Sequence, residues 1–157
     1  MFTFLRRFAR DTSPRGLALA ALASGAYADA EARFGALLDG SEVSADRALF
    51  QNKRGIARVR LGLRDLALED FRGALAYVEN YPPALTNIGN LLLEDGALDD
   101  AIAHYEAAIR RDDEYAVAYQ NLGIALKRAG RVDEGVRALR RASRLEGGIF
   151  GKPRKRV

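Results

Sequence analysis

Four glycines, Gly25, Gly62, Gly96 and Gly130, recur along the chain at an almost constant interval of about 34–37 residues, a spacing typical of repeat architectures. Similar residues recur at fixed distances from each of them: Ala or Gly seven residues before, Ala or Gly five residues after, and Phe, Tyr or Leu nine residues after. Because similar residues recur at several fixed positions relative to each glycine, the pattern indicates that the chain repeats a single supersecondary unit.

Each repeat contains two apolar-periodic segments joined by one of these glycines. Segments of ~14 residues are long enough for ordinary α-helices of three to four turns. The glycine between them predicts a tight turn and therefore an antiparallel helix pair. The small residues should lie where two helix backbones approach closely, and the aromatic or Leu residue should fill the space between helices. Ser13 and Pro14 suit the N-cap and first turn of the first helix.

The period and the columns resemble the tetratricopeptide repeat (TPR) family. The clearest copies are LTNIG at residues 85–89, followed by Ala101 and Tyr105, and YQNLG at residues 119–123, followed by Gly135 and Leu139. The resemblance implies an all-α, right-handed solenoid of about four TPR-like antiparallel helix pairs. We place the repeats at residues 11–47, 48–81, 82–115 and 116–147, with an N-terminal segment at 1–10 and a C-terminal tail at 148–157.

The second repeat places charged residues at positions that are usually apolar. Arg54 and Arg58 lie in its first helix, and Asp70 precedes the aromatic Phe71 of its second helix. A buried arginine without a partner would be very unfavourable. We therefore predict that Arg54 pairs with Asp70 across the helix pair, in a structural role.

The N-terminal segment, residues 1–10, is both aromatic and basic. We interpret it as a cap over the open apolar end of the solenoid, and an anchor on an anionic membrane surface stays open. A secretory signal is disfavoured because Asp11, Pro14 and Arg15 interrupt the transition from basic to apolar residues. The apolar residues of this segment are Phe2, Phe4, Leu5 and Phe8, and its basic residues are Arg6, Arg7 and Arg10.

The C-terminal tail, residues 148–157, is basic and is expected to be flexible. Such tails contact nucleic-acid phosphates or acidic lipid. A chain break at Gly147–Gly148 should leave Val136 and Leu139 partly uncovered, which predicts self-association or partner docking at this end. The basic residues of the tail are Lys152, Arg154, Lys155 and Arg156, and the preceding helix adds Arg137, Arg140, Arg141 and Arg144.

The sequence contains no recognisable catalytic or metal-binding arrangement. It has no Cys and one His, which excludes a thiolate zinc site, an iron–sulfur cluster, a cysteine nucleophile and a multi-histidine metal site. It has neither a phosphate-binding Gly-rich loop nor a G-x-S-x-G nucleophile elbow. We interpret His104 as an exposed structural residue. We expect no enzyme activity, no metal and no cofactor.

The resemblance implies that the first helices of the repeats line a concave groove that binds a partner. Basic residues outnumber acidic ones there, so we expect an acidic peptide or helix. Asn87 and Asn121 stand one repeat apart, and their amides could bind a peptide backbone or satisfy neighbouring helices. The predicted groove residues are Leu49, Asn52, Lys53, Ile56, Arg60, Asn87, Asn90, Leu93, Gln120, Asn121, Ile124, Lys127 and Arg128.

We expect a non-enzymatic protein–protein interaction module, an adaptor or scaffold that binds a partner's segment in this groove. One alternative is a peripheral membrane assembly factor held by its basic ends. Another is nucleic-acid contact through the C-terminal tail, although no aromatic platform accompanies that basic run. We expect a cytoplasmic location, with peripheral membrane attachment left open and secretion disfavoured.

Overall fold

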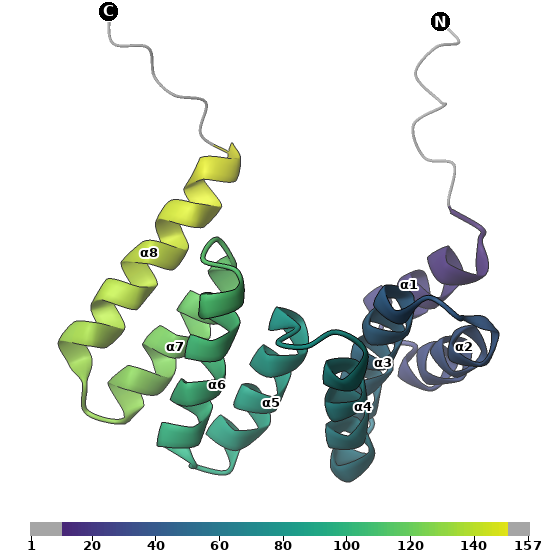
Figure 1. Ribbon diagram of the computed structural model, residues 1–157, viewed down its shortest axis with the longest axis horizontal. Coiled ribbons are helices and arrows are strands. Elements are labelled where there is room, and N and C mark those ends of the chain that lie inside the picture. The colour runs from purple at the N-terminus through teal and green to yellow at the C-terminus, as the bar shows by residue number, and fades with distance from the viewer. Residues whose placement is uncertain (1–10, 151–157) are drawn as a thin grey trace, which may run out of the picture. The chain divides into compact units, whose positions relative to one another are not determined.

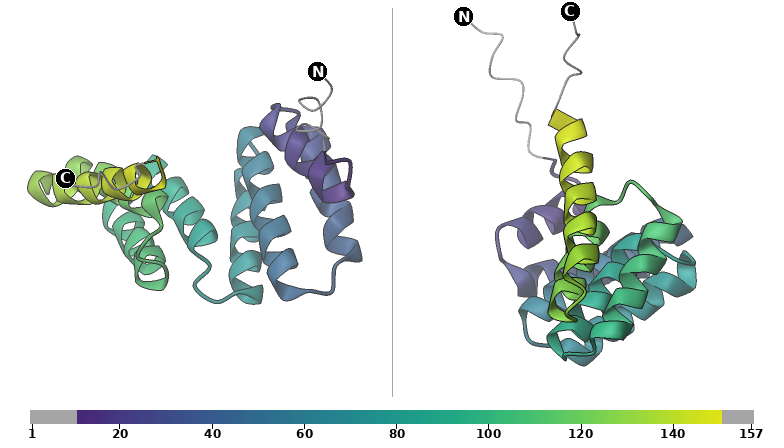
Figure 2. Two further views of the ribbon diagram at one scale, coloured as in Figure 1. Left: turned by 90° about the horizontal axis from the view of Figure 1, so that it is seen from above. Right: turned by 90° about the vertical axis from the view of Figure 1, so that its left-hand side faces the viewer.

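A computed structural model describes the backbone of residues 11–150 and the side chains of residues 11–147 (Figures 1 and 2). Within these residues the elements are all α-helices and none is a strand, so the prediction of an all-α fold is confirmed. Helices consecutive in sequence form four antiparallel pairs, as predicted. The helices are α1 (Pro14–Ala23), α2 (Tyr27–Gly40), α3 (Ser44–Arg60), α4 (Arg64–Tyr77), α5 (Pro82–Glu94), α6 (Leu98–Arg111), α7 (Ala116–Arg128) and α8 (Val132–Phe150).

The chain divides into two compact units, unit 1 (Met1–Tyr77) and unit 2 (Val78–Val157). In unit 1, α2 packs against both α1 and α3, and α3 packs against α4. In unit 2, α6 packs against α5 and α7, and α7 packs against α8. The first helices of the two pairs of unit 2, α5 and α7, also contact each other.

The four recurring glycines make the turn inside each helix pair. Gly25, Gly62, Gly96 and Gly130 have φ angles of +81°, +77°, +79° and +81°, the left-handed region that favours glycine. In each turn, the residue after the glycine donates its backbone N–H to a carbonyl five residues earlier, at 2.8–2.9 Å. This is the Schellman ending, which satisfies carbonyls at the helix C-terminus and reverses the chain. The repeated glycine therefore specifies the antiparallel pair.

A second column of small residues lets the two helices of a pair approach closely. A Cβ atom added at Gly55 or Gly89 would lie 2.6 Å from a ring carbon of Phe71 or Tyr105, respectively. The same atom at Gly123 would lie 2.6 Å from Leu139 Cγ. In these three repeats the small residue lies at a close approach of the two helices and the large residue nine positions after the turn packs on it, which agrees with the roles predicted for both.

The observed helices differ from the predicted repeat boundaries in two places. Helix α3 begins at Ser44, four residues before the expected boundary, with Asp46 in its first turn, where a carboxylate is favourable. Helix α8 continues through Gly147 and Gly148 to Phe150, so the expected break at these glycines is wrong. Glycine lowers helix propensity by about 1 kcal/mol but keeps its backbone N–H, so it does not by itself end a helix.

The buried ion pair predicted in the second repeat is confirmed and belongs to a larger network. Arg54 Nη2 lies 2.7 Å from Asp70 Oδ1, and the Asp70 side chain is only 3% exposed. Arg58 Nη1 lies 3.0 Å from the other oxygen of Asp70, and Arg58 Nε lies 2.8 Å from Glu31 Oε1. Glu31 is on α2, so the network joins α2, α3 and α4.

Replacing Asp70 by Ala should destabilise the protein by about 2–3 kcal/mol, because two partly buried arginines would lose their shared carboxylate. The control is Asp29→Ala, since Asp29 forms an exposed pair with Arg33 at 2.8 Å. That change should lower stability by less than ~1 kcal/mol. Urea unfolding of both variants measures the difference, and equal losses would contradict a structural role for the network.

Replacing Gly89 by Ala should destabilise unit 2 by about 1–3 kcal/mol, because the new methyl group would press on the rigid Tyr105 ring. Gly147 is the matched control: it is also helical, but a Cβ there would meet nothing within 4 Å. Gly147→Ala should therefore be neutral, or stabilising by up to ~1 kcal/mol. Thermal unfolding followed by circular dichroism compares the two, and a harmless Gly89→Ala would argue against the close approach.

Candidate functional site

The predicted groove residues of the third and fourth repeats come together on two neighbouring helices. Helices α5 and α7 contact each other, and we call the surface that they share the α5–α7 face. Asn87 and Asn90 on α5 and Asn121 on α7 are half-buried there. The remaining predicted residues of this face are Leu93 on α5 and Gln120, Ile124, Lys127 and Arg128 on α7.

A hydrogen-bonded cluster lies beneath the α5–α7 face. The Tyr105 hydroxyl of α6 donates to Asn90 Oδ1 at 2.8 Å, and Asn121 Nδ2 donates to the same oxygen at 2.9 Å. Burial raises the pKa of the Tyr105 phenol, and the Glu94 carboxylate raises it further. The phenol therefore stays protonated and remains a donor. Asn90 thus links α5 to α6 and to α7.

This cluster decides between the two interpretations for Asn121, one of the two recurring asparagines, and it also involves the predicted groove residue Asn90. The Asn90 oxygen and one Asn121 donor serve neighbouring helices, so these atoms hold the face together. The interpretation that they bind a partner's backbone does not apply to these atoms. The period showed that amides recur, but it could not show which helix each amide faces.

The exposed part of the α5–α7 face has two apolar side chains, the amide of Gln120 between them, and a basic end. Val117 and Ile124, seven residues apart on α7, are 44% and 42% exposed. Lys127 and Arg128 follow in the last turn of α7 and are also exposed. Arg128 Nη1 donates to the Leu93 carbonyl at 3.3 Å, which places its guanidinium over the C-terminal end of α5. The face thus offers apolar contact beside two cations.

The predicted groove residues of the second repeat all lie on α3, in unit 1. Leu49, Lys53 and Ile56 are half-buried and Arg60 is exposed. Asn52 is only 2% exposed, so its assignment as a partner-binding residue is wrong. It occupies the slot that Thr86, also 2% exposed, fills in the third repeat. The family resemblance assigned this slot to the groove, whereas in this structure it faces the interior.

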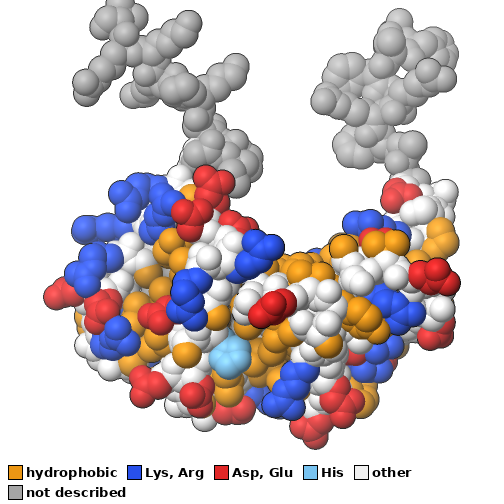
Figure 3. Space-filling view, in the orientation of Figure 1, with side chains coloured by type: hydrophobic (Ala, Val, Ile, Leu, Met, Phe, Trp, Pro, Cys, Tyr) orange, Lys and Arg blue, Asp and Glu red, His pale blue; other side chains and the backbone are white. Residues whose placement is uncertain are grey.

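The outer surface of α8 is basic. Arg137, Arg140 and Arg144 are exposed at helical spacing and, with Ser143, line a shallow hollow of about 520 Å³. Blue Lys and Arg side chains gather over this part of the chain in Figure 3. Val136 and Leu139 on α8 are half-buried, as expected. The predicted N-terminal segment and the basic tail residues Lys152, Arg154, Lys155 and Arg156 lie outside the described residues.

The remaining titratable residues form no recognisable reactive site within residues 11–147. His104 is half-buried rather than exposed, and its Nδ1 lies 2.9 Å from the Asp100 carbonyl. Among the side chains that the structure describes, no group of three or more His, Asp or Glu is placed to hold a metal ion. No helix in the described part of the chain has the length and apolar character required to cross a bilayer.

Comparison with known proteins matches the helix pairs to a repeat family. A family model described as TPR repeat matches residues 89–130, which run from α5 to the turn after α7. Among solved structures, MamA superposes with a TM-score of 0.69 at 22% identity, over 88% of this chain and 81% of that chain. The family match supports the predicted TPR resemblance at residues 89–130, and the superposition confirms the fold.

Two further solved structures share the fold. YrrB, a TPR protein with an unusual peptide-binding site, superposes with a TM-score of 0.64 at 23% identity, over 87% of this chain and 69% of that chain. BtubC (BKLC) from P. vanneervenii superposes with a TM-score of 0.73 at 19% identity, over 92% and 67% of the two chains. At these identities the likeness concerns the fold.

Replacing Asn90 by Ala should destabilise unit 2 by about 1–3 kcal/mol, because the buried Tyr105 hydroxyl would lose its acceptor. In the Asn90→Ala protein, Tyr105→Phe should lower the free energy of unfolding by less than it does in the unchanged protein, because the acceptor of the hydroxyl is already missing. Gln120→Ala, an exposed change on α7, is the control and should stay within ~0.5 kcal/mol. Additive effects of Asn90→Ala and Tyr105→Phe in urea unfolding would contradict the coupling.

Proposed function

We propose that this tetratricopeptide-repeat protein is a non-enzymatic protein–protein interaction module whose α5–α7 face binds a peptide segment of a partner. The observation that carries the proposal is the pair of exposed apolar side chains, Val117 and Ile124, on an otherwise well-packed helix. Isolated exposed apolar residues are common on protein surfaces. These two lie on one face of α7, two turns apart and beside a second helix, with the amides of Gln120 and Asn121 between them. We call this row of two apolar anchors the apolar strip.

The proposed partner segment is acidic. Lys127 and Arg128 lie at the end of the apolar strip, three and four residues after Ile124, and both are exposed. Glu94 is the exposed acidic residue in the last turn of α5. An acidic residue placed beside an apolar anchor would meet the two cations at the C-terminal end of α7, and such complementarity favours both association rate and specificity.

The rigidity of the face supports peptide binding. The Asn90 cluster fixes α5, α6 and α7 to one another beneath the exposed residues. A surface that is already ordered loses little conformational entropy on binding, so more of the interaction energy appears as affinity. The peptide-binding description of YrrB, a structural neighbour, is consistent with this use of the fold.

The membrane and nucleic-acid alternatives depend on other parts of the chain. Both rely on the basic termini, which lie outside the described residues, together with the arginines of α8. They remain predictions from the sequence, as do the cytoplasmic location and self-association through the last repeat. The α5–α7 face is separate from the basic surface of α8, so the proposed function can be tested independently of these alternatives.

Peptides that are selected from a displayed random library for binding to the full chain should be apolar and acidic. Ile124→Asp should weaken their binding roughly tenfold, because it places a charge in the apolar strip. The double charge reversal Lys127→Glu with Arg128→Glu should also weaken binding and should reduce its dependence on salt. Calorimetric titration of each purified variant measures both effects.

The matched control is Leu66→Asp on α4, where a similarly exposed Leu (40%) lies in unit 1. This variant should bind the selected peptides like the unchanged protein. Circular dichroism confirms that each variant remains helical. Peptides that bind Ile124→Asp as well as the unchanged chain, or that lose binding with Leu66→Asp, would contradict the assignment of the α5–α7 face.

A further inference from the structure

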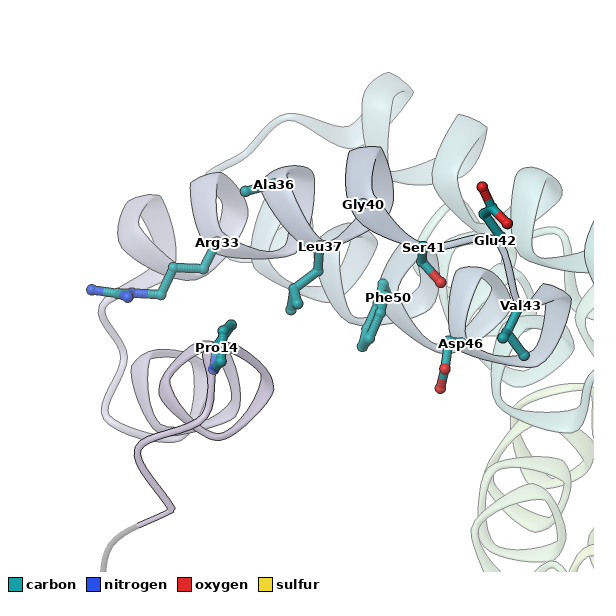
Figure 4. A pocket seen from close by; sticks show the side chains of 10 residues that line it. All are labelled: Pro14, Arg33, Ala36, Leu37, Gly40, Ser41, Glu42, Val43, Asp46 and Phe50. Atoms are coloured by element: carbon teal, nitrogen blue, oxygen red, sulfur yellow. The ribbon is translucent and has the colours of Figure 1, made fainter.

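Unit 1 contains a hollow of about 600 Å³ that the proposed function does not use. It lies between the start of α1, the second half of α2 and the start of α3, as Figure 4 shows. Leu37 of α2 and Phe50 of α3 point into it, and Pro14 of α1 faces them from the other side. Val43, in the α2–α3 connection, borders it and is 58% exposed.

The hollow has a specific origin in the shortness of α1. Helices α5 and α7 begin about four helical turns before their turn glycines, Gly96 and Gly130, whereas α1 begins at Pro14, only about three turns before Gly25. About one helical turn is therefore missing at the start of α1. Any contact between α1 and α3 is smaller than the contact between α5 and α7, the first helices of unit 2. The surfaces of α2 and α3 that a longer α1 would cover are left open.

The hollow is apolar, with acidic residues at one edge and Arg33, which pairs with Asp29, at the other. Its floor is formed by Leu37 and Phe50, and Val43 adds exposed apolar surface. Glu42 and Asp46 lie at the edge, next to Val43 (Figure 4). Asp46 already attracts one cation, since Arg15 Nη1 lies 3.7 Å from its carboxylate in a half-exposed pair. The occupant that fits is a short apolar segment that carries positive charge.

We propose that residues 1–10 of this chain dock in the hollow. This segment, MFTFLRRFAR, lies outside the described residues and is joined through residues 11–13 to the helix whose first residue lines the hollow. It contains three Phe residues and one Leu for the apolar floor, and three Arg residues for the acidic edge. Glu42 and Asp46 provide the complementary charge. The segment replaces the turn that α1 lacks and covers the open end of unit 1.

The tether makes this contact favourable even if the segment has little affinity by itself. Few residues separate the segment from Pro14, and each extended residue spans up to ~3.5 Å, so its side chains reach the hollow without strain. A short link also keeps the local concentration of the segment on the order of millimolar. A partner that bound residues 1–10 would have to compete with the hollow, so docking also limits access to the segment.

A single tryptophan tests the proposal in the full chain, because the natural sequence contains no Trp. With Phe4→Trp, docking predicts a blue-shifted emission and several-fold weaker quenching by acrylamide than for a free tryptophan. Adding Val43→Lys should restore a red-shifted, freely quenched emission, because it places a cation in the apolar part of the hollow beside the acidic edge. Val132→Lys, a change at a similarly exposed Val (51%) of unit 2, should not. A tryptophan that is fully quenched in the Phe4→Trp protein, or an emission unaffected by Val43→Lys, would overturn the proposal.

Engineered cysteines give an independent test, since the chain has no Cys of its own. At micromolar concentration, Phe4→Cys with Val43→Cys should form an intramolecular disulfide at least ten times faster than Phe4→Cys with Val132→Cys. Equal rates would argue against docking in this hollow. Crosslinking mainly between chains, with a rate that rises with concentration, would show that the segment binds another copy and would also overturn the proposal.

Discussion

The fold depends on how closely the two helices of each pair approach each other. In three of the four pairs, a glycine in the first helix leaves only enough room for the ring or isobutyl group of the residue that packs on it. The turn glycine reverses the chain between the two helices through its left-handed φ. This reversal brings the large residue of the second helix opposite the glycine of the first helix. Together the two glycines fix the geometry of a pair with almost no freedom for a larger side chain. The positions of all surface residues on these helices follow from that geometry.

Buried polar contacts then connect one pair to the next, and the two units use different chemistry for this purpose. Unit 1 uses charges: Asp70 is shared by two arginines, and Arg58 extends the network to α2. Unit 2 uses neutral groups: the Asn90 oxygen accepts from a phenol and from the amide of Asn121. Charged groups are unfavourable to bury unless every partner is present, whereas amides and hydroxyls tolerate a low-dielectric environment more easily. The neutral cluster lies beneath the face that we propose as the binding surface. The charged side chains of that face, Lys127 and Arg128, lie at its exposed end.

The sequence predicted the features that depend on the spacing of residues and on the need of a buried charge for a partner. The glycine period indicated four helix pairs, and the cost of burying an unpaired arginine led to the Arg54–Asp70 contact. The sequence did not predict that Asn52 is buried, because the interior or exterior position of a slot depends on helices that pack across it. The role of Glu31 was missed for the same reason, since this residue comes from the preceding pair. The continuation of α8 through Gly147 shows that propensity alone does not locate a helix end.

The pattern of contacts within each unit has a further consequence for how the chain reaches its structure. Apart from the contact between α5 and α7, the described helices of a unit pack mainly against helices adjacent in sequence. The contacts that stabilise the fold therefore join residues that are close along the chain, and chains of low contact order lose little loop-closure entropy before their contacts form. Such a protein should fold rapidly and begin folding at any pair, with neighbouring pairs adding to it in sequence. A growing chain could then complete its N-terminal pairs while later ones are still being synthesised.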